Sequence, residues 1–281
     1  MRTTLRLILA LIALPGALAA DEITWLAMEF PPFYIAEGPE RGRGIADVVT
    51  TRLQVHLPGY QHREEVAEPA AIMARMKAGD RVCSAAYIRT PEREKVLAYS
   101  TPDLILPPNG VTIRREALAR FGSGAPVSLA RLLEDRSLKV AVAVGRSYGP
   151  ALDTLLEKHK TSSHVYWRRG DDIYRGLFEM LAKGSVDYVI GYPYEARYMA
   201  RLSGLGDGIV SVPLTEAPEY TFAHVVCPRN EWGRRVIAAV DAALAVERPR
   251  AEYRQAIERW LDASLLDEFR RQYETRFVGG R

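Results

Sequence analysis

Apolar runs that end in turn residues recur along the chain, and helical patterns follow them. Residues 23–33 (ITWLAMEFPPF) form an apolar run that ends in a proline-rich turn, and residues 138–149 (LKVAVAVGRSYG) form another that ends in a glycine-rich turn. Each is followed by a helical pattern, and then by a further helix and strand at residues 72–87 and 173–192. Alternation of this kind is typical of βαβ units with largely parallel sheets. The pattern therefore predicts an α/β protein that uses one layout twice.

The helix in residues 173–192 has the clearest amphipathic pattern. Its apolar side chains fall at i, i+3, i+4 and i+7 and so share one helix face: Tyr174, Leu177, Phe178 and Leu181. Gly184 follows this helix, and Gly79 follows the corresponding helix of the first half. Glycine just past a helix supplies a left-handed cap, so both helices are expected to end there.

Two sets of such units predict two lobes. Between them, a strand over Val111–Arg114 gives way to a Gly/Pro/Ser-rich connection within residues 107–128. A second connection followed by a strand occupies residues 215–230, and the tail from Glu231 to Phe277 reads as helical. The tail has no third strand–turn unit, so it is expected to pack back on the first lobe. Because ligands of doubly wound sheets bind beyond the carboxyl ends of the strands, we expect a site in the cleft between the lobes.

Residues 1–20 have the composition of a secretory signal peptide. Two arginines precede an apolar run at residues 7–14, and small residues at 17–19 suit a cleavage site. The run is shorter than the ~20 apolar residues that span a bilayer. We therefore expect export and cleavage after Ala19 or Ala20.

Charge and composition exclude some classes of partner. Removal of the two signal-peptide arginines from the 38 basic residues leaves the mature chain nearly neutral beside its 35 acidic residues. Acidic and basic residues interleave, which is typical of a solvated surface and does not favour nucleic acid or a membrane. The five histidines and two cysteines show no metal-ligand spacing, so neither a metal nor a cofactor is expected.

Residues Gly145–Gly149 match the Gly-x-Ser-x-Gly pattern of serine hydrolases, with Ser147 at the nucleophile position. Asp187 and His224 follow in the chain order that such a triad requires, although His224 lies in an apolar strand-like run where a core histidine is expected. The same residues also suit a strand-to-helix turn whose backbone amides hold an anion. The motif alone leaves both interpretations open.

Residues 88–102 (IRTPEREKVLAYSTP) carry Thr90-x-x-Arg93 followed by Tyr99-Ser100-x-Pro102. This segment resembles a signature of the periplasmic solute-binding proteins of family 3, which bind polar amino acids for ABC transporters. Other segments follow the order of that family across the mature chain: PPFY, MKAGDRVC, LKVAVAVGRSYG, GSVDYVIGYP and YTFAHVVCPRNEWGRRVIAAVDAAL.

The resemblance implies a two-lobed periplasmic-binding-protein (Venus-flytrap) fold. Each lobe would hold a mostly parallel sheet flanked by helices, and two hinge crossings would join them. Lobe 1 would comprise residues 21–115 and 218–281, and lobe 2 residues 116–217.

The arginine of T-x-x-R lies in the cleft of that family and pairs with the ligand carboxylate, a role that falls on Arg93 here. A guanidinium is a planar fork of donors that matches a carboxylate. This chain departs from the family upstream, where Ala86 and Ile88 replace small hydroxyl residues, and in lobe 2, where Tyr192 replaces an acid that receives the α-ammonium group. An anion clamp without an amine receptor favours a small organic anion with a flat or aromatic body over an amino acid.

The remaining expectations for the site follow from the same resemblance. The 145–149 turn would offer free amides at a helix start, Ser147 would cap the helix or donate a hydrogen bond, and Arg146 would add charge. Glu29 is a candidate acceptor for a ligand donor. The residues expected to surround the ligand are Glu29, Phe30, Phe33, Tyr34, Tyr87, Ile88, Arg93, Arg146, Ser147, Tyr148 and Tyr192.

Family strand order also gives the two cysteines a meaning. Cys83 starts the strand before T-x-x-R, and Cys227 ends the strand that returns from lobe 2 and lies antiparallel beside it. The resemblance thus implies a disulfide between Cys83 and Cys227, which an oxidising compartment allows to persist.

The expected function is that of a monomeric periplasmic receptor that closes on a carboxylate ligand and is recognised by a membrane permease or a sensor. Three alternatives are a dehydratase of cyclohexadienyl acids with Glu29 as its proton-transfer group, a Ser147 hydrolase, and a binding domain that acts without a permease.

Overall fold

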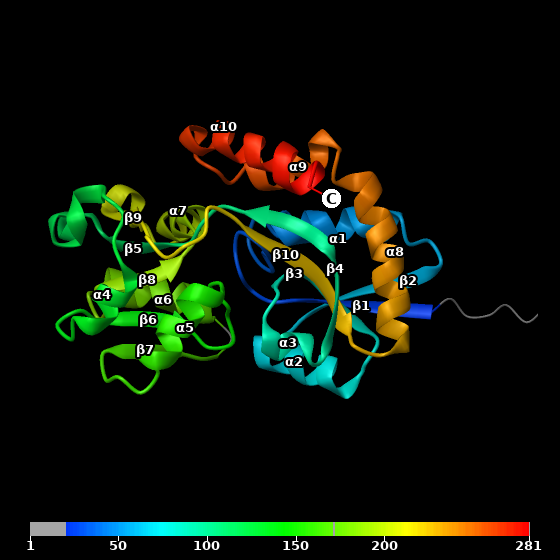
Figure 1. Ribbon diagram of the computed structural model, residues 1–281, viewed down its shortest axis with the longest axis horizontal. Helices are drawn as coiled ribbons and strands as arrows, with labels where there is room; N and C mark the ends of the chain where they lie inside the picture. Colours follow the sequence, from blue (N-terminus) through cyan, green and yellow to red (C-terminus); the bar gives the residue numbers. More distant parts are fainter. Residues whose placement is uncertain (1–20, 171, 281) are drawn as a thin grey trace, which may run out of the picture.

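The computed structural model describes residues 21–170 and 172–280, and the expected signal peptide lies outside this range. Figure 1 shows two lobes, each built on a five-stranded sheet. The first sheet has the order β2-β1-β3-β10-β4 and consists of β1 (Asp21–Ala27), β2 (Tyr60–Val66), β3 (Val82–Ile88), β4 (Leu97–Leu106) and β10 (Thr221–Pro228). The second has the order β7-β6-β8-β5-β9 and consists of β5 (Gly110–Arg114), β6 (Val140–Ala143), β7 (Val165–Arg168), β8 (Tyr188–Gly191) and β9 (Ile209–Pro213).

Helices lie against both sheets. Those of the first half are α1 (Ile45–Val55), α2 (Pro69–Ala78) and α3 (Pro91–Glu94). The second lobe has α4 (Leu129–Glu134), α5 (Pro150–Lys158), α6 (Ile173–Ala182) and α7 (Pro193–Leu202), with the 3-10 segments η1 (Arg115–Gly124) and η2 (Gly206–Gly208). The chain ends in α8 (Glu231–Glu247), α9 (Ala251–Glu258), α10 (Ala263–Gln272) and the π-helical segment η3 (Tyr273–Val278).

Each sheet contains one strand that runs against the others. In the first sheet β1 is parallel to β2 and β3, whereas β10 is antiparallel to β3 and β4. In the second sheet β6 is parallel to β7 and β8, whereas β5 is antiparallel to β8 and β9. The two-lobed α/β fold with mostly parallel sheets is therefore confirmed.

The chain crosses between the sheets twice, at residues 107–109 and 214–220. The first crossing comes earlier than the lobe boundary expected after residue 115. The strand Gly110–Arg114 belongs to the second sheet because all of its residues pair with β9. Which sheet a strand joins is decided by these pairings, which its own residues do not reveal.

The amphipathic pattern of α6 is confirmed. Its four apolar-face residues are all buried: Tyr174, Leu177, Phe178 and Leu181. The apolar face of the helix therefore packs against the protein interior, as an amphipathic helix does. Gly79 and Gly184 take left-handed φ values of 82° and 69° just past α2 and α6. Only glycine adopts this conformation without strain from a Cβ atom, so both helices end there.

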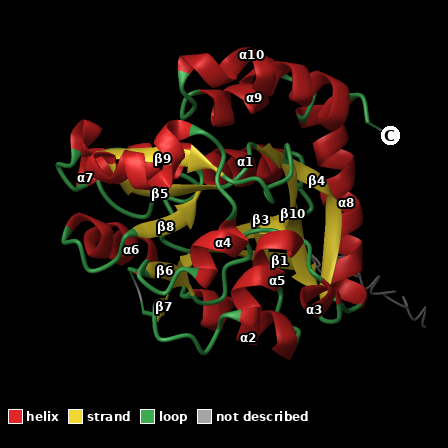
Figure 2. Cartoon of the chain, turned by 60° about the vertical axis from the view of Figure 1, so that its left-hand side comes forward, coloured by secondary structure: helices red, strands yellow, loops and turns green. Residues whose placement is uncertain are grey.

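The C-terminal tail packs on the first lobe, as expected, and also reaches the second. Helix α8 lies against β4 and β10, and α9 lies against α1. Figures 1 and 2 show α9 and α10 above the sheets, with α10 extending toward the second lobe. Trp260 after α9 meets Tyr198 of α7 edge-on, with ring centroids 5.5 Å apart. The tail therefore bridges the two lobes.

Cys83 and Cys227 form the disulfide that the resemblance implies. The bond joins the neighbouring antiparallel strands β3 and β10, and both cysteines are fully buried. The two cysteines are separated by 144 positions in sequence, and the loop between them includes all of the second sheet.

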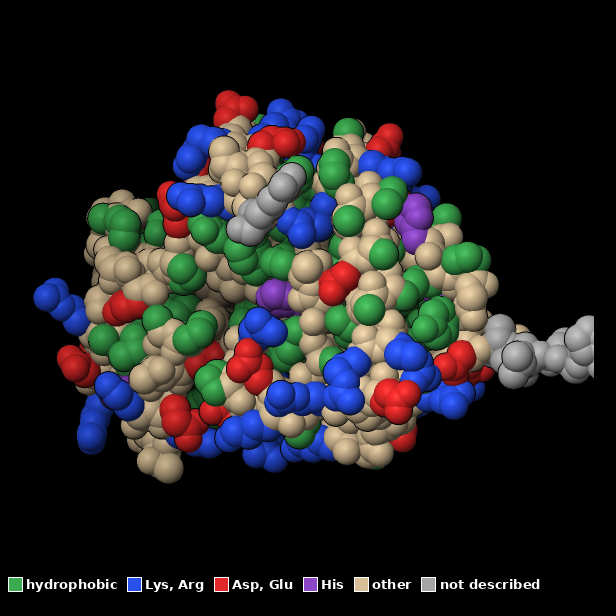
Figure 3. Space-filling model, turned by 45° about the vertical axis from the view of Figure 1, so that its right-hand side comes forward, with side chains coloured by type: hydrophobic (Ala, Val, Ile, Leu, Met, Phe, Trp, Pro, Cys, Tyr) green, Lys and Arg blue, Asp and Glu red, His purple; other side chains and the backbone are tan. Residues whose placement is uncertain are grey.

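The outer surface mixes charges of both signs. Figure 3 shows acidic side chains interspersed among basic ones on the face that it presents. Among the described residues, no helix combines the length and apolar character needed to cross a membrane.

Candidate ligand-binding site

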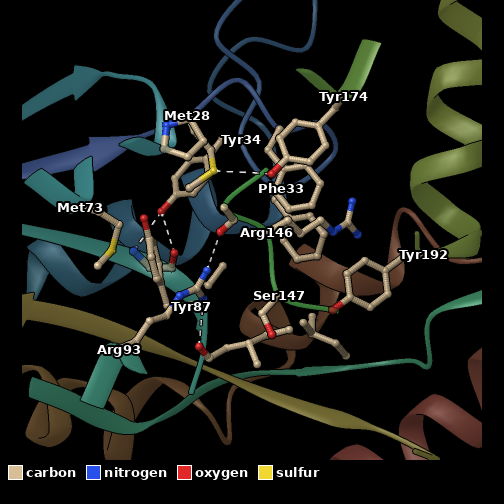
Figure 4. Close-up of a pocket in the computed structure, with 17 residues that line it drawn as sticks. Met28, Phe33, Tyr34, Met73, Tyr87, Arg93, Arg146, Ser147, Tyr174 and Tyr192 are labelled. Atoms are coloured by element: carbon tan, nitrogen blue, oxygen red, sulfur yellow. Dashed lines mark hydrogen bonds between the residues drawn. The ribbon is translucent and has the colours of Figure 1, made fainter. Parts of the chain in front are cut away.

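A small cavity lies between the two lobes. Its volume is about 60 Å³, which is room for a few water molecules. Figure 4 shows the rings of Tyr174, Phe33 and Tyr192 on one side and those of Tyr34 and Tyr87 on the other. Nine residues that the sequence assigned to the site line it: Phe30, Phe33, Tyr34, Tyr87, Ile88, Arg93, Arg146, Ser147 and Tyr192.

Direct contact between aromatic rings closes the cleft. Phe33 of the first lobe lies 5.5 Å from Tyr192 and 5.8 Å from Tyr194, measured between ring centroids. Phe30 stacks on Tyr174 of α6 at 4.0 Å and 20°. Because these pairs join residues of different lobes, the structure represents the closed arrangement.

Arg93 reaches across the cleft. Thr90 caps α3 by accepting a hydrogen bond from the Arg93 backbone N–H, which fixes the start of this short helix. The Nη1 group of Arg93 donates to the carbonyl oxygen of Ile88 (3.0 Å), and its Nη2 group donates to that of Gly145 in the second lobe (2.8 Å). The guanidinium carbon lies 5.2 Å from the centre of the Tyr87 ring. Arg93 thus lines the interlobe cavity beside the 145–149 turn.

Arg93 forms no ion pair among the described residues, although its positive charge acts on the carboxyl group of Asp153, where it opposes the rise in pKa that burial causes. Within residues 21–170 and 172–280, no carboxylate lies within ion-pair distance of its guanidinium. The two carbonyls use two of its five N–H groups, which leaves donors for a ligand. A cation in this position favours an anionic guest.

Two of the amides in the 145–149 turn, which we expected to be free, are engaged within the turn. The Ser147 hydroxyl donates to Asp153 (2.5 Å) and accepts from the Gly149 N–H (3.2 Å), while the Tyr148 N–H donates to Asp153 (2.7 Å). Pro150 begins α5 and has no N–H to offer. The Tyr148 and Gly149 amides are therefore satisfied within the turn itself.

Three amides earlier in the turn remain open. The backbone N–H groups of Gly145, Arg146 and Ser147 have no acceptor among the described residues, and all three residues line the cavity. These amides, rather than those of Tyr148 and Gly149, are the backbone donors beside Arg93.

A hydrolytic triad is not assembled around Ser147. His224 bonds the carbonyl oxygen of Ser100 in the first sheet at 2.8 Å, and burial lowers its pKa. Asp187 accepts from the Lys139 N–H at 2.7 Å in the second lobe. Ser147 instead bonds Asp153, whose pKa is raised by burial. The motif forms the turn that leads into α5, with Gly149 at the N-cap position.

Arg146 does not add free charge to the site, contrary to expectation. Its guanidinium forms two hydrogen bonds of 2.9 Å with the two carboxylate oxygens of Glu195 on α7. The side chains of Arg146 and Glu195 are 4% and 1% exposed, so the pair is buried and electrically balanced. Four rings surround the guanidinium carbon, with centroids at 4.7 to 5.5 Å: Tyr148, Phe30, Tyr192 and Tyr174.

Sequence reasoning missed Glu195 and Tyr174. It searched for an acid at the position of Tyr192 and found none, although Glu195 follows three residues later and also accepts from the Tyr192 N–H at 3.2 Å. Tyr174 was assigned only to the apolar face of α6. The sequence Tyr192-Pro193-Tyr194-Glu195 was the available signal, since an acid in the first turn of a helix is stabilised there by the helix dipole.

Two residues assigned to the site do not line this cavity. Glu29 accepts a hydrogen bond from the Ala36 N–H (2.7 Å) outside it, and burial raises the pKa of its carboxyl group. Tyr148 lies beyond Arg146, where its hydroxyl accepts from the Ala143 N–H (2.9 Å). No group of three or more His, Cys, Asp or Glu side chains is placed to hold a metal ion in the described part of the chain.

Comparison with known proteins identifies the fold of the chain. No protein-family model matches the chain, and no curated protein matches it. Among solved structures, it is similar to an ancestral arginine-binding protein bound to arginine (17% identity, 86% of this chain and 99% of that one, TM-score 0.66). It is also similar to an amino acid ABC transporter substrate-binding protein from Streptococcus pneumoniae bound to L-arginine (17% identity, 86% and 94%, TM-score 0.63).

A third similar structure is a histidine kinase sensor domain with similarity to periplasmic binding proteins (16% identity, 86% and 96%, TM-score 0.65). Identities this low carry the fold and no residue roles. The chain therefore has the two-lobed fold of the periplasmic binding proteins.

Proposed function

We propose that this protein is an exported solute-binding protein that holds a small organic anion or amino-acid-like carboxylate between its lobes. The observation that carries the proposal is the Arg93 guanidinium at the interlobe cavity, which has no ion-pair partner among the described residues. We infer that the ligand-bound protein is recognised by a membrane permease or by a sensor. This inference is based on two proteins with the same fold, an ABC transporter component and a kinase sensor domain.

The electrostatics favour a carboxylate at Arg93 over one at Arg146. Arg146 already has a carboxylate partner in Glu195, whereas Arg93 bonds only carbonyl oxygens. An ionised acceptor forms stronger hydrogen bonds than a neutral carbonyl, so a ligand carboxylate competes well for the Arg93 donors. The open N–H groups of Arg146 and Ser147 supply further donors from the other lobe.

The walls of the cavity suit a flat or apolar ligand body. Phe30, Phe33, Tyr87 and Tyr192 line it, and aromatic stacking adds to the burial of apolar area. Because the closed cavity holds only a few water molecules, a ligand enters when the lobes part. The crossings at residues 107–109 and 214–220 are where hinge motion is expected.

A binding role accounts for the site better than catalysis. Ser147 is committed to Asp153 and Gly149, and Glu29 to Ala36. A hydrolase or a dehydratase would need these groups facing a substrate. We therefore expect the protein to return its ligand unchanged.

Native mass spectrometry of freshly purified protein, followed by a thermal-shift screen of small carboxylates, tests the proposal. We expect at least one carboxylate to raise the melting temperature of the wild type but not that of Arg93→Ala. Arg89→Ala is the matched control, since Arg89 is a neighbouring exposed arginine paired with Glu94. The proposal fails if no carboxylate stabilises the wild type, or if Arg93→Ala responds as Arg89→Ala does.

A further inference from the structure

The surroundings of Arg146 have the composition of a binding cage for a cation. Rings of Phe30, Tyr148, Tyr174 and Tyr192 lie within 5.5 Å of its guanidinium carbon, and the carboxylate of Glu195 faces its N–H groups. Aromatic faces around a carboxylate attract guanidinium and ammonium groups through the ring quadrupole and the opposite charge. In this chain the occupant is one of its own side chains.

The cage belongs to the cleft rather than to the core of one lobe. Phe30 comes from the first lobe, and Tyr148, Tyr174 and Tyr192 come from the second. Phe30, Arg146, Tyr174 and Tyr192 also line the interlobe cavity. A ligand carboxylate on Arg93 would therefore have its other end beside the cage.

Arg146 reaches the cage from the turn that meets Arg93. Its neighbour Gly145 accepts the hydrogen bond from Arg93, so the two guanidinium groups flank one short segment. They differ in charge balance, because Arg146 is neutralised by Glu195 and Arg93 has no carboxylate partner among the described residues. The end of the cleft at Arg93 thus favours an anion, while the end at the cage already holds the guanidinium cation of Arg146.

We propose that the side chain of Arg146 is a tethered occupant of this cage, which Phe30, Tyr148, Tyr174, Tyr192 and Glu195 form. It excludes guanidinium and ammonium groups from that end of the cleft. This selectivity rests on the proposed function, because it restricts the ligands of Arg93 to carboxylates that carry no cationic group at their far end. The cage itself does not depend on that function.

Arg146→Ala tests the cage directly, with methylguanidinium as the probe and its neutral isostere methylurea as the control. We expect methylguanidinium to bind Arg146→Ala at least about tenfold more tightly than the wild type in calorimetric titration. It should raise the melting temperature of the variant relative to sodium chloride at equal ionic strength, and methylurea should not. Arg146→Ala with Glu195→Gln, which keeps the rings but removes the charge, should lose this gain.

Three outcomes would overturn the proposal: equal responses of wild type and Arg146→Ala to methylguanidinium, no response of a folded Arg146→Ala, or an undiminished response of the double variant. If Arg146→Ala is unfolded in buffer, its refolding yield from urea is compared in methylguanidinium and in sodium chloride. A higher yield in methylguanidinium supports the proposal, and an equal yield contradicts it.

L-Arginine then tests the selectivity. Wild type should show no binding, and Arg146→Ala should bind it; binding by the wild type contradicts the exclusion. Because methylguanidinium has no carboxylate, the cage experiment is independent of Arg93. A failed carboxylate screen with a successful methylguanidinium titration would refute the proposed function alone, and the reverse pair of results would refute the cage alone.

Discussion

The guanidinium of Arg93 in the first lobe donates a hydrogen bond of 2.8 Å to the carbonyl oxygen of Gly145 in the second. The same guanidinium also donates a hydrogen bond of 3.0 Å to the carbonyl oxygen of Ile88 within the first lobe. Arg93 is thus a latch between the lobes as well as the charged group of the proposed site. A ligand carboxylate would bind a guanidinium that already forms a hydrogen bond between the closed lobes.

Removal of this latch should favour the open form of the ligand-free protein. A hydrogen bond from a charged group contributes about 1.5–3 kcal/mol, so we expect Arg93→Ala to shift the closed-to-open equilibrium by about tenfold or more. Small-angle X-ray scattering would report it as an increased radius of gyration. Arg89→Ala should scatter like the wild type. Identical curves for Arg93→Ala and wild type would show that Arg93 does not hold the lobes together.

Loss of the carboxylate that balances Arg146 should be costly. Glu195→Gln leaves a guanidinium that is 4% exposed without its counter-charge, and breaking a buried pair in this way costs about 3–5 kcal/mol. Urea unfolding measures the change. Glu157→Gln is the matched control because its pair with Lys160 is exposed, and such pairs contribute about 1 kcal/mol or less. Equal losses in the two variants would mean that the Arg146–Glu195 pair is not buried in solution.

The disulfide should contribute substantially to stability. It links Cys83 to Cys227 over a sequence separation of 144, and loss of a native disulfide costs about 2–5 kcal/mol. We expect the free energy of unfolding of Cys83→Ala with Cys227→Ala, measured in urea, to fall by that amount. Thiol labelling of the denatured, non-reduced wild type should find no free thiol. Two labelled cysteines would exclude the bond.

Asp103 on β4 gives the fold a pH dependence. It is fully buried and burial raises its pKa to about 7, while its Oδ2 accepts from the Ala86 N–H and its Oδ1 has no partner among the described residues. The folded state therefore binds a proton that the unfolded chain releases near pH 4. This contribution to stability is complete below about pH 4 and is lost as pH rises toward 7.

We expect Asp103→Asn to remove this loss, since the amide cannot ionise and still has an oxygen for the Ala86 N–H. The variant should gain on wild type by about 1–4 kcal/mol between pH 4 and pH 8. Urea unfolding across this range is the measurement. A constant difference between the two proteins would mean that Asp103 is ionised throughout.

The fold and the Arg93 end of the site could be predicted from local sequence signals. The strand–helix alternation and the cap glycines Gly79 and Gly184 are set by near neighbours, so pattern reading suffices. Arg93 stands in a short motif whose placement follows from Thr90 capping α3. Cys83 and Cys227 were paired through the strand order of the resembling family.

The features that the sequence did not reveal depend on distant partners. Glu195 lies 49 residues from Arg146, and nothing near either residue says that they neutralise each other. Tyr174 fits an apolar helix face whether that face meets the core or the other lobe. Glu29 follows a strand as a ligand-binding acid would, yet its carboxylate is taken by the Ala36 N–H.

A crystal structure of the protein with a carboxylate from the thermal-shift screen tests the central claim most directly. The account expects the carboxylate between the lobes, within hydrogen-bond distance of the Arg93 guanidinium and of the N–H groups of Arg146 and Ser147. A carboxylate bound elsewhere, with Arg93 still bonded only to Ile88 and Gly145, would contradict it.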